Sequence, residues 1–181
     1  MADQPVAPET LWRVSPVGVG GGIGRGEMGT GLSVGEAFAK WSDDLTRYAT
    51  VLVGPDDAGD IVNQAFASVL AARSWDTVSS HKGYLYRSTL NAARAQRRSQ
   101  GRRDAREWRH GSTSVEHWDL LADPAVVAAV NGLSLRQRAV VYLTYWEDMT
   151  PQSIAADLAV SEGTVRRQLA RARARLRKVL L

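Results

Sequence analysis

The sequence contains no cysteine, only two phenylalanines and no apolar run near the length needed to span a bilayer. Without cysteine, disulfides and thiolate metal sites are excluded, and a reducing compartment is expected. A transmembrane helix needs about 20 consecutive apolar residues, so no membrane insertion is predicted. The first residues, M-A-D-Q-P-V-A-P-E-T, lack the basic start and apolar middle of a secretory signal. We therefore expect a cytoplasmic protein.

Signals for catalysis and cofactors are also missing. His81, His110 and His117 have no metal-ligand spacing, so neither a metal nor another cofactor is predicted. No nucleophile, general base and orienting partner can be assigned together, which argues against an enzyme. The segment G-R-G-E-M-G at residues 24–29 matches the dinucleotide pattern G-x-G-x-x-G, but no strand precedes it and no crossover helix follows. Nucleotide binding there is not expected.

The composition favours helices. The chain has 181 residues, of which 44% are hydrophobic, with alanine and leucine prominent. Alanine and leucine have high helix propensity, whereas a β-sandwich would need more β-branched and aromatic residues. A chain of this length forms one or two small domains. We predict an all-α fold of two small helical domains.

Charge is distributed unevenly along the chain. Between Glu36 and Asp60 six acidic residues face two basic ones, whereas the seven basic residues between Arg166 and Lys178 have no acidic neighbour. A second arginine-rich stretch covers residues 94–109. The acidic surface suits a basic protein, and the two basic surfaces suit phosphate groups. Binding to a polyanion is therefore predicted.

The first 35 residues hold nine of the sixteen glycines and three of the six prolines. Such a composition cannot offset the entropy lost on ordering, so a flexible leader is predicted for 1–35. From Val34 apolar residues recur three or four apart, until Gly54 and Pro55 interrupt the pattern. Two further helices are predicted, from about Asp56 to Ala72 and from about Tyr84 to Arg98. Together they define a first domain at 36–98.

The stretch 99–122 is polar and rich in glycine and serine, which predicts a linker. A second domain is predicted at 123–181. Within it, Ser134 and Gln137 form a capping-box signature, Thr150 is placed to cap a helix with Pro151 at its first position, and Ser161 is placed to cap the last helix.

The segment from Pro151 fits a helix-turn-helix unit. The small residue at the helix crossing is Ala155, the turn residue is Ala159, and the inward apolar residue of the second helix is Val165. Ile154, Leu158, Val160 and Leu169 complete the apolar seam. A turn position of this kind favours glycine because its φ is positive, so Ala159 either carries a strain of roughly 1 kcal/mol or the turn has another shape.

In a helix-turn-helix unit the start of the second helix reaches base edges in the major groove. The predicted readers are Ser161, Glu162, Thr164, Arg166 and Arg167. Further along, R-A-R-A-R-L-R is either a solvated helix end or a set of phosphate contacts. Since no acidic residue pairs with these cations, phosphate contact by Arg171 and Arg173 is preferred.

Residues 133–176, from L-S-L-R-Q-R to A-R-A-R-L, resemble region 4 of bacterial RNA polymerase sigma factors and also the DNA-binding tail of response-regulator-type activators. The first domain distinguishes the two. D-D-A-G-D-I-V-N-Q-A-F at 56–66 is similar to the core-binding helix of sigma region 2, and K-G-Y-L-Y-R-S-T-L-N-A-A-R-A-Q-R-R at 82–98 to the helix that melts and reads the minus-10 element. The chain thus resembles a sigma-70-family factor of the extracytoplasmic-function group.

The resemblance implies two further sets of site residues. Core polymerase would be bound by Asp57, Asp60, Ile61, Asn63, Gln64 and Phe66. The minus-10 element would be bound by Ser80, His81, Lys82, Tyr84, Tyr86, Arg87, Asn91, Arg94, Arg97 and Arg98. For Ile61, Phe66 and both tyrosines, packing in the core is the alternative, and for Ser80 a helix cap. Ser80, His81 and Lys82 are placed in a loop before the helix.

The implied partners are core RNA polymerase and promoter DNA, with an anti-sigma protein as a further candidate, and a free monomer is expected. The alternative function is an autonomous helix-turn-helix activator or repressor. Such a protein would dimerise and bind half-sites about one turn apart.

Overall fold

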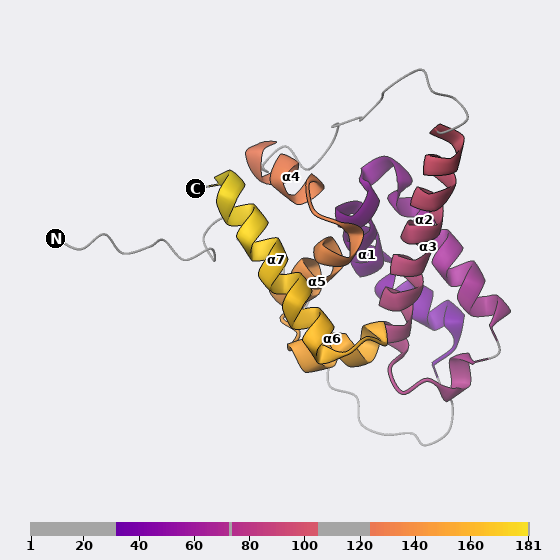
Figure 1. Cartoon of the computed structure of the whole chain (residues 1–181). Coiled ribbons are helices and arrows are strands. Elements are labelled where there is room, and N and C mark those ends of the chain that lie inside the picture. The colour runs from indigo at the N-terminus through magenta and orange to yellow at the C-terminus, as the bar shows by residue number, and fades with distance from the viewer. Residues whose placement is uncertain (1–31, 73, 105–123, 181) are drawn as a thin grey trace. The chain divides into compact units, whose positions relative to one another are not determined.

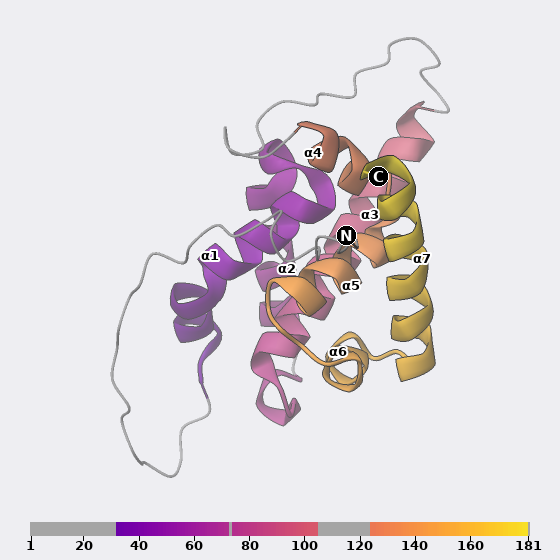
Figure 2. The same ribbon diagram turned by 90° about the vertical axis from the view of Figure 1, so that its left-hand side faces the viewer.

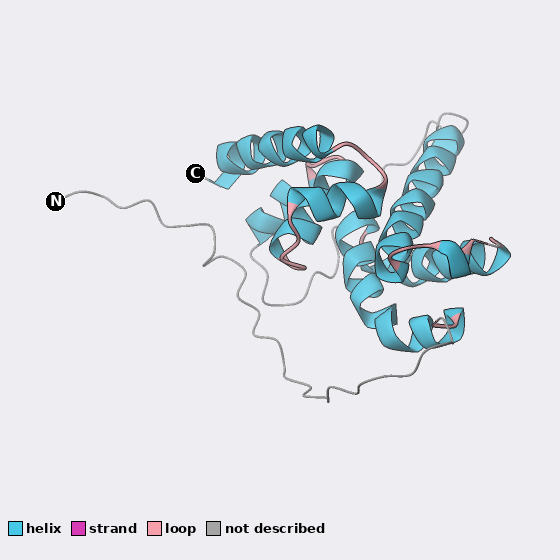
Figure 3. Cartoon of the chain, turned by 90° about the horizontal axis from the view of Figure 1, so that it is seen from below, coloured by secondary structure: helices cyan, strands magenta, loops and turns pink. Residues whose placement is uncertain are grey.

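The computed structural model describes residues 32–72, 74–104 and 124–180, and all regular elements in these ranges are helical (Figures 1 and 3). In chain order they are α1 (Val34–Val53), α2 (Pro55–Ala71), the single 3-10 turn η2 (Trp75–Thr77), α3 (His81–Asp104), α4 (Pro124–Asn131), α5 (Leu135–Tyr145), α6 (Pro151–Leu158) and α7 (Glu162–Leu180). The predicted all-α class is confirmed. Residues 1–31 of the predicted leader, with the G-R-G-E-M-G match, and residues 105–122 of the predicted linker lie outside the described residues. The leader was predicted to end at residue 35, but Ser33 caps α1 and Val34 begins it, because the capping box with Glu36 starts the helix earlier.

The first half contains α1, α2 and α3 packed against one another. α1 begins with a capping box, in which the Glu36 amide donates to Ser33 Oγ at 3.2 Å and the Ser33 amide donates to Glu36 Oε2 at 2.8 Å. It ends at Gly54, whose φ of 99° only glycine adopts readily, and Pro55 starts α2. The interruption predicted between these two helices is therefore confirmed.

Two features of this half differ from expectation. α3 begins at His81 and continues to Asp104, because arginine and glutamine sustain a helix well beyond the last apolar residue. Phe38 of α1 and Leu70 of α2 are large apolar residues, yet they are 42% and 69% exposed. Phe38 still covers the core from outside, with its ring centroid 4.8 Å from that of Phe66.

In the second half, α7 packs along α4, α5 and α6. The predicted capping box opens α5: the Gln137 amide donates to Ser134 Oγ at 3.3 Å, and the Ser134 amide donates to Gln137 Oε1 at 2.9 Å. Thr150 caps α6 by accepting from the Ser153 amide at 3.2 Å. Local capping chemistry therefore fixes these helix starts as the sequence predicts.

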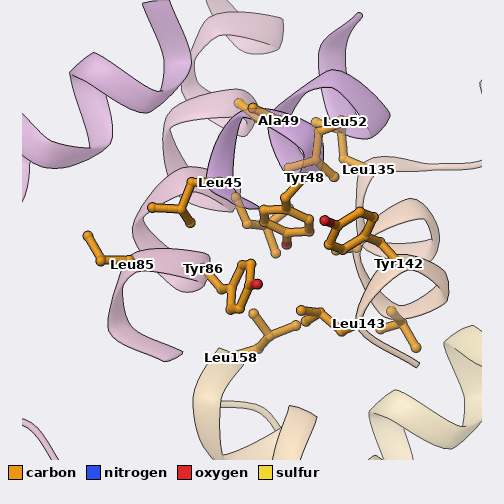
Figure 4. Packing of buried hydrophobic residues seen from close by; sticks show 14 of the residues in the cluster. Leu45, Tyr48, Ala49, Leu52, Leu85, Tyr86, Leu135, Tyr142, Leu143 and Leu158 are labelled. Carbon is orange, nitrogen blue, oxygen red and sulfur yellow. The ribbon is translucent and has the colours of Figure 1, made fainter. Parts of the chain in front are cut away.

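The two halves share one core. Tyr48 of α1 lies between Tyr86 of α3 and Tyr142 of α5, with ring centroids 5.0 Å and 5.2 Å away (Figure 4). Each such aromatic pair contributes about 0.5–1.5 kcal/mol beyond the burial of its surface. α1 also packs against α5, and α6 lies beside the first half of α3 (Figures 1 and 2). This packing brings the predicted functional surfaces of the two halves together.

Candidate nucleic-acid and polymerase interfaces

α6 and α7 form the helix-turn-helix. Ala155 is buried where the helices cross, and Val165 is fully buried in the seam. Ala159 has φ 52° and ψ 52°, so the turn has the left-handed conformation that normally selects glycine, and alanine adopts it here. Val160 differs from expectation: it is 37% exposed at the edge of the seam.

The predicted base readers lie at the N-terminal end of α7. Ser161 caps the helix by accepting from the Thr164 amide at 3.2 Å. Arg166 and Arg167 are both exposed, and Arg166 Nη2 lies 2.6 Å from Glu162 Oε1. The pair leaves the Arg166 guanidinium exposed at the end of the helix where base contacts are predicted.

The later arginines of α7 lie on its solvent side. Arg171, Arg173, Arg175 and Arg177 are exposed, while Leu169, Ala172 and Leu176 of the same helix are buried. In the described part of the chain no carboxylate forms a salt bridge with these four arginines. Arg173 is positioned differently: its Nε donates to Tyr145 Oη at 2.7 Å, and its guanidinium lies over that ring. The α7 surface can therefore meet a phosphate backbone without breaking an ion pair.

The predicted minus-10 residues run from Ser80, just before α3, to Arg98 in its second half. Ser80 caps α3 by accepting from the Gly83 amide at 3.0 Å, which is the alternative foreseen for it. His81 and Lys82 lie inside the helix, so their predicted placement in a loop is wrong. The cap simply starts the helix earlier than the apolar pattern suggests. Arg87 lies over the ring of the half-buried Tyr84, at 5.0 Å from its centroid.

Tyr86 is not available to a base in this structure. The residue is only 1% exposed, and burial, with Glu147 nearby, raises the pKa of its hydroxyl. Its ring belongs to the core shared by the two halves (Figure 4). Tyr86 therefore packs in the core, which was the alternative stated for it, because its ring faces α1 and not the solvent. Asn91, by contrast, is exposed.

Lys82 links the two halves. Its Nζ lies 2.8 Å from Glu147 Oε2, in the loop after α5, and 3.4 Å from Asp44 Oδ2 on α1. Burial lowers the pKa of the ammonium, but the bonds to Glu147 and Asp44 outweigh burial and leave the pKa raised. Lys82 must release these carboxylates before it can contact DNA.

The predicted polymerase contacts on α2 fall into two groups. Asp60, Asn63 and Gln64 are exposed, and Asp57 is half-buried. Ile61 and Phe66 are 1% and 4% exposed, so they fill the core and do not present their side chains to a partner. The accessible residues of this predicted contact set are therefore polar and partly acidic.

Sequence reasoning missed Arg138 of α5. Its buried guanidinium donates to three carbonyls: Leu52 at 2.8 Å, Asn131 at 2.6 Å and Leu133 at 3.2 Å. Leu52 and Asn131 lie in the last turns of α1 and α4, where carbonyls lack helical partners and the dipole favours a cation. The sequence shows only a charged residue directly before the apolar run 139–143.

α6 packs against the first turn of α3, within the stretch predicted to bind the minus-10 element. A Cβ added to Gly83 of α3 would clash with the carboxylate of Asp157 of α6. Further along α3, Arg87, Asn91 and Arg94 share a crevice with Thr164 of α7. The two predicted DNA-reading surfaces therefore face each other across one interface.

Neither membrane insertion nor metal binding has a structural signal in the described ranges. No helix there combines the length and apolarity needed to cross a bilayer. The His, Asp and Glu side chains described form no group that would hold a metal ion.

A family model matches the second half of the chain, and relatives match most of its length. Residues 124–176 match the family model described as Sigma-70, region 4. The chain is 33% identical over 160 residues to an RNA polymerase sigma-E factor of Streptomyces coelicolor, covering 85% of this chain and 89% of that protein. A protein of the same name from Streptomyces antibioticus is 32% identical over 164 residues, covering 87% and 88%.

Two solved structures share the helical arrangement. The sigma factor RpoE in complex with the anti-sigma factor NepR from Bartonella quintana superposes with a TM-score of 0.65 at 23% identity, covering 81% of this chain and 95% of that one. CnrH in complex with the cytosolic domain of CnrY gives 0.56 at 25% identity, covering 81% and 86%. The first likeness, below 25% identity, concerns the fold alone.

Proposed function

The chain belongs to the RNA polymerase sigma factors, in the extracytoplasmic-function group of the sigma-70 family, and we propose a division of labour between its two halves. As a member of this family, it binds core RNA polymerase and directs promoter-specific initiation of transcription. The polymerase performs the chemistry in the cytoplasm, and this chain contributes recognition without a catalytic role of its own.

The helix-turn-helix of α6 and α7 is proposed to bind the minus-35 element. Arg166 and Arg167 reach base edges, while Arg171 and Arg173 contact phosphates. The observation that carries this assignment is the exposed, carboxylate-free arginine surface directly behind the capped start of α7.

The first half of α3 is proposed to bind the minus-10 element. Asn91 offers an amide that can pair with a base edge, and Tyr84 offers an aromatic ring on which an unpaired base can stack. Arg87 over Tyr84 adds a cation at the same place. Arg94, Arg97 and Arg98 continue the basic surface towards the end of the helix.

The polar surface of α2 is proposed to dock on core polymerase through Asp57, Asp60, Asn63 and Gln64. Reversing Asp57 and Asp60 to lysine should abolish co-purification with core polymerase while the helical content stays unchanged. Reversing Asp148, which lies outside α2, is the matched control. Retained binding by the double variant would refute this docking surface.

Simultaneous binding of both elements is proposed to require opening of the interface between the halves. The packing of α6 on α3 and the Lys82–Glu147 pair cover residues that DNA must reach. A partner that holds the halves closed would act as an inhibitor, and the solved sigma factor RpoE in complex with the anti-sigma factor NepR makes an anti-sigma protein a candidate for that partner.

In vitro transcription with purified core polymerase tests the proposed function. Added chain should produce defined start sites, preceded by common minus-10 and minus-35 sequences. Gel filtration and footprinting test the alternative of an autonomous dimeric regulator: the proposal expects a monomer that protects promoters only together with polymerase. A dimer that protects palindromic half-sites without polymerase would favour the alternative.

A further inference from the structure

A hollow lined mostly by arginines lies where the second half of α3 meets the start of α5. Its volume is about 360 Å³, and its walls are Arg94, Arg97, Arg98, Ser134, Leu135 and Arg136. We propose that this arginine hollow binds a small phosphate-rich anion, either an inorganic polyphosphate or the polyphosphate group of a nucleotide. Arg136 belongs neither to the proposed DNA contacts nor to the proposed polymerase contacts. Anion binding in the hollow therefore does not depend on either of those assignments.

The four guanidinium groups of the hollow carry charge that the described chain does not neutralise. None of them takes part in a salt bridge there. Burial lowers the pKa of Arg94, and the positive charges of Arg136 and Arg98 lower it further. The protein therefore holds these cations close together against their mutual repulsion. A multivalent anion between them would attract each guanidinium and offset that repulsion.

The position of Arg136 also favours an anion site. It is the second residue of α5, where the positive end of the helix dipole disfavours a cation. The first amides of a helix also lack intrahelical acceptors, and Leu135 and Arg136 both line the hollow. Four arginines and the start of α5, where the helix dipole is positive, thus lie around one space, and this is the chemistry that recognises phosphate oxygens.

The size and construction of the hollow favour a small anion over duplex DNA. Its volume falls at the lower end of the range, about 300–1,000 Å³, that is typical of small-molecule sites. One wall belongs to α3 and the other to α5, so an anion held by both would tie the halves together. Since Arg94, Arg97 and Arg98 are also proposed DNA contacts, the bound anion would compete with the minus-10 element.

Titration of the full chain with tripolyphosphate, at ionic strength held constant with sodium chloride, tests the proposal without polymerase or promoter. Calorimetry should detect saturable binding, and saturating anion should raise the unfolding midpoint by about 4 °C. Arg136→Ala should weaken binding about tenfold or more, because one charge-assisted contact is lost. Arg98→Ala, from the opposite wall, should do the same.

Arg177→Ala is the matched control, since it removes one exposed arginine of α7 outside the hollow. It should leave tripolyphosphate affinity within about twofold of the parent. Without anion, Arg136→Ala should keep or raise the unfolding midpoint because repulsion is relieved.

Equal weakening by Arg136→Ala and Arg177→Ala would overturn the proposal, because binding would then follow net charge. Absence of saturable tripolyphosphate binding would overturn it as well. An Arg136-dependent affinity for a single-stranded oligonucleotide, with none for tripolyphosphate, would assign the hollow to the nucleic-acid backbone instead. If Arg136→Ala lowers helical content, the comparison of Arg98→Ala with Arg177→Ala decides.

Discussion

The two arginine-bearing helices, α3 and α7, present their cations differently. On α7 the exposed arginines alternate with buried apolar residues, so the basic surface faces solvent along the whole described helix. On α3, Arg87 and Arg94 are half-buried and line a crevice shared with the helix-turn-helix. The same residue type is thus exposed along α7, whereas on α3 it is partly covered at Arg87 and Arg94 and exposed only further along, at Arg97 and Arg98. Access therefore depends on packing between the halves, and not on local composition.

Replacing Arg138 should disturb the packing between the two halves most strongly. Arg138→Ala deletes three hydrogen bonds to carbonyls, including the one to α1, and should lower the free energy of unfolding by about 3 kcal/mol. For a chain of this size the midpoint should fall by roughly 6–12 °C. Arg138→Met, which keeps the buried stem without the donors, should show most of the loss. Arg136→Ala serves as the exposed control, and a loss below about 1 kcal/mol in Arg138→Ala would contradict the assigned role.

Within α7, the arginines that read bases and those that contact phosphates should respond differently to replacement by alanine. Replacing Arg166 or Arg167, whichever reads a base, by alanine should cost about 1–3 kcal/mol and relax preference at one minus-35 position. Arg171→Ala should weaken binding to all sequences alike and reduce the salt slope by roughly 0.9. Holoenzyme binding to minus-35 variants at several salt concentrations measures both effects. A change of base preference in Arg171→Ala would show that the two roles are wrongly divided.

A weaker interface between the two halves should make the proposed minus-10 surface of α3 more accessible. Glu147→Gln removes the carboxylate that Lys82 contacts at 2.8 Å and should weaken the closed arrangement by about 1 kcal/mol, since the pair is only partly exposed. Affinity for a single-stranded minus-10 oligonucleotide should rise about fivefold. Glu162→Gln, which breaks a pair confined to α7, should leave that affinity unchanged.

The pH dependence of the Lys82–Glu147 pair follows from the direction in which the pKa of Lys82 is shifted. The pKa of Lys82 is raised in the folded chain, so its stabilisation is fully present below the ordinary value of 10.5 and is lost only as the pH rises through the higher folded value. The fivefold difference between Glu147→Gln and the parent should therefore persist from pH 6 to pH 9. Its disappearance within that window would mean that another group controls the closed arrangement.

Helix starts were predictable because their causes are local. Ser134 with Gln137, and Thr150 with Pro151, contain in a few residues the hydrogen bonds that start a helix. The helix-turn-helix seam was predictable for the same reason, as Ala155, at the crossing, shows. The division into two domains and the residue roles at the DNA and polymerase surfaces stay predictions.

Contacts between the halves could not be predicted from the sequence. Arg138 and Glu147 depend on partners far away in the chain, and no local pattern specifies those partners. Periodicity also cannot distinguish an apolar residue that fills the core from one that meets a partner, which is why Phe66 and Tyr86 had two interpretations. The structure resolves that ambiguity through burial alone.

The smallest expected effect concerns the turn that orients α7. Ala159 occupies a left-handed conformation that costs a residue with a Cβ about 1 kcal/mol, and Ala159→Gly would remove that strain. Glycine also gains more freedom in the unfolded chain, which costs roughly 0.5 kcal/mol, so the net stabilisation should be about 0.5 kcal/mol. Urea unfolding of both proteins measures it, with Ala156→Gly inside α6 as a control that should destabilise by about 1 kcal/mol. Minus-35 preference should not change, because the turn keeps its shape and only its strain is removed; equal destabilisation by both glycines would mean that Ala159 is not left-handed in solution.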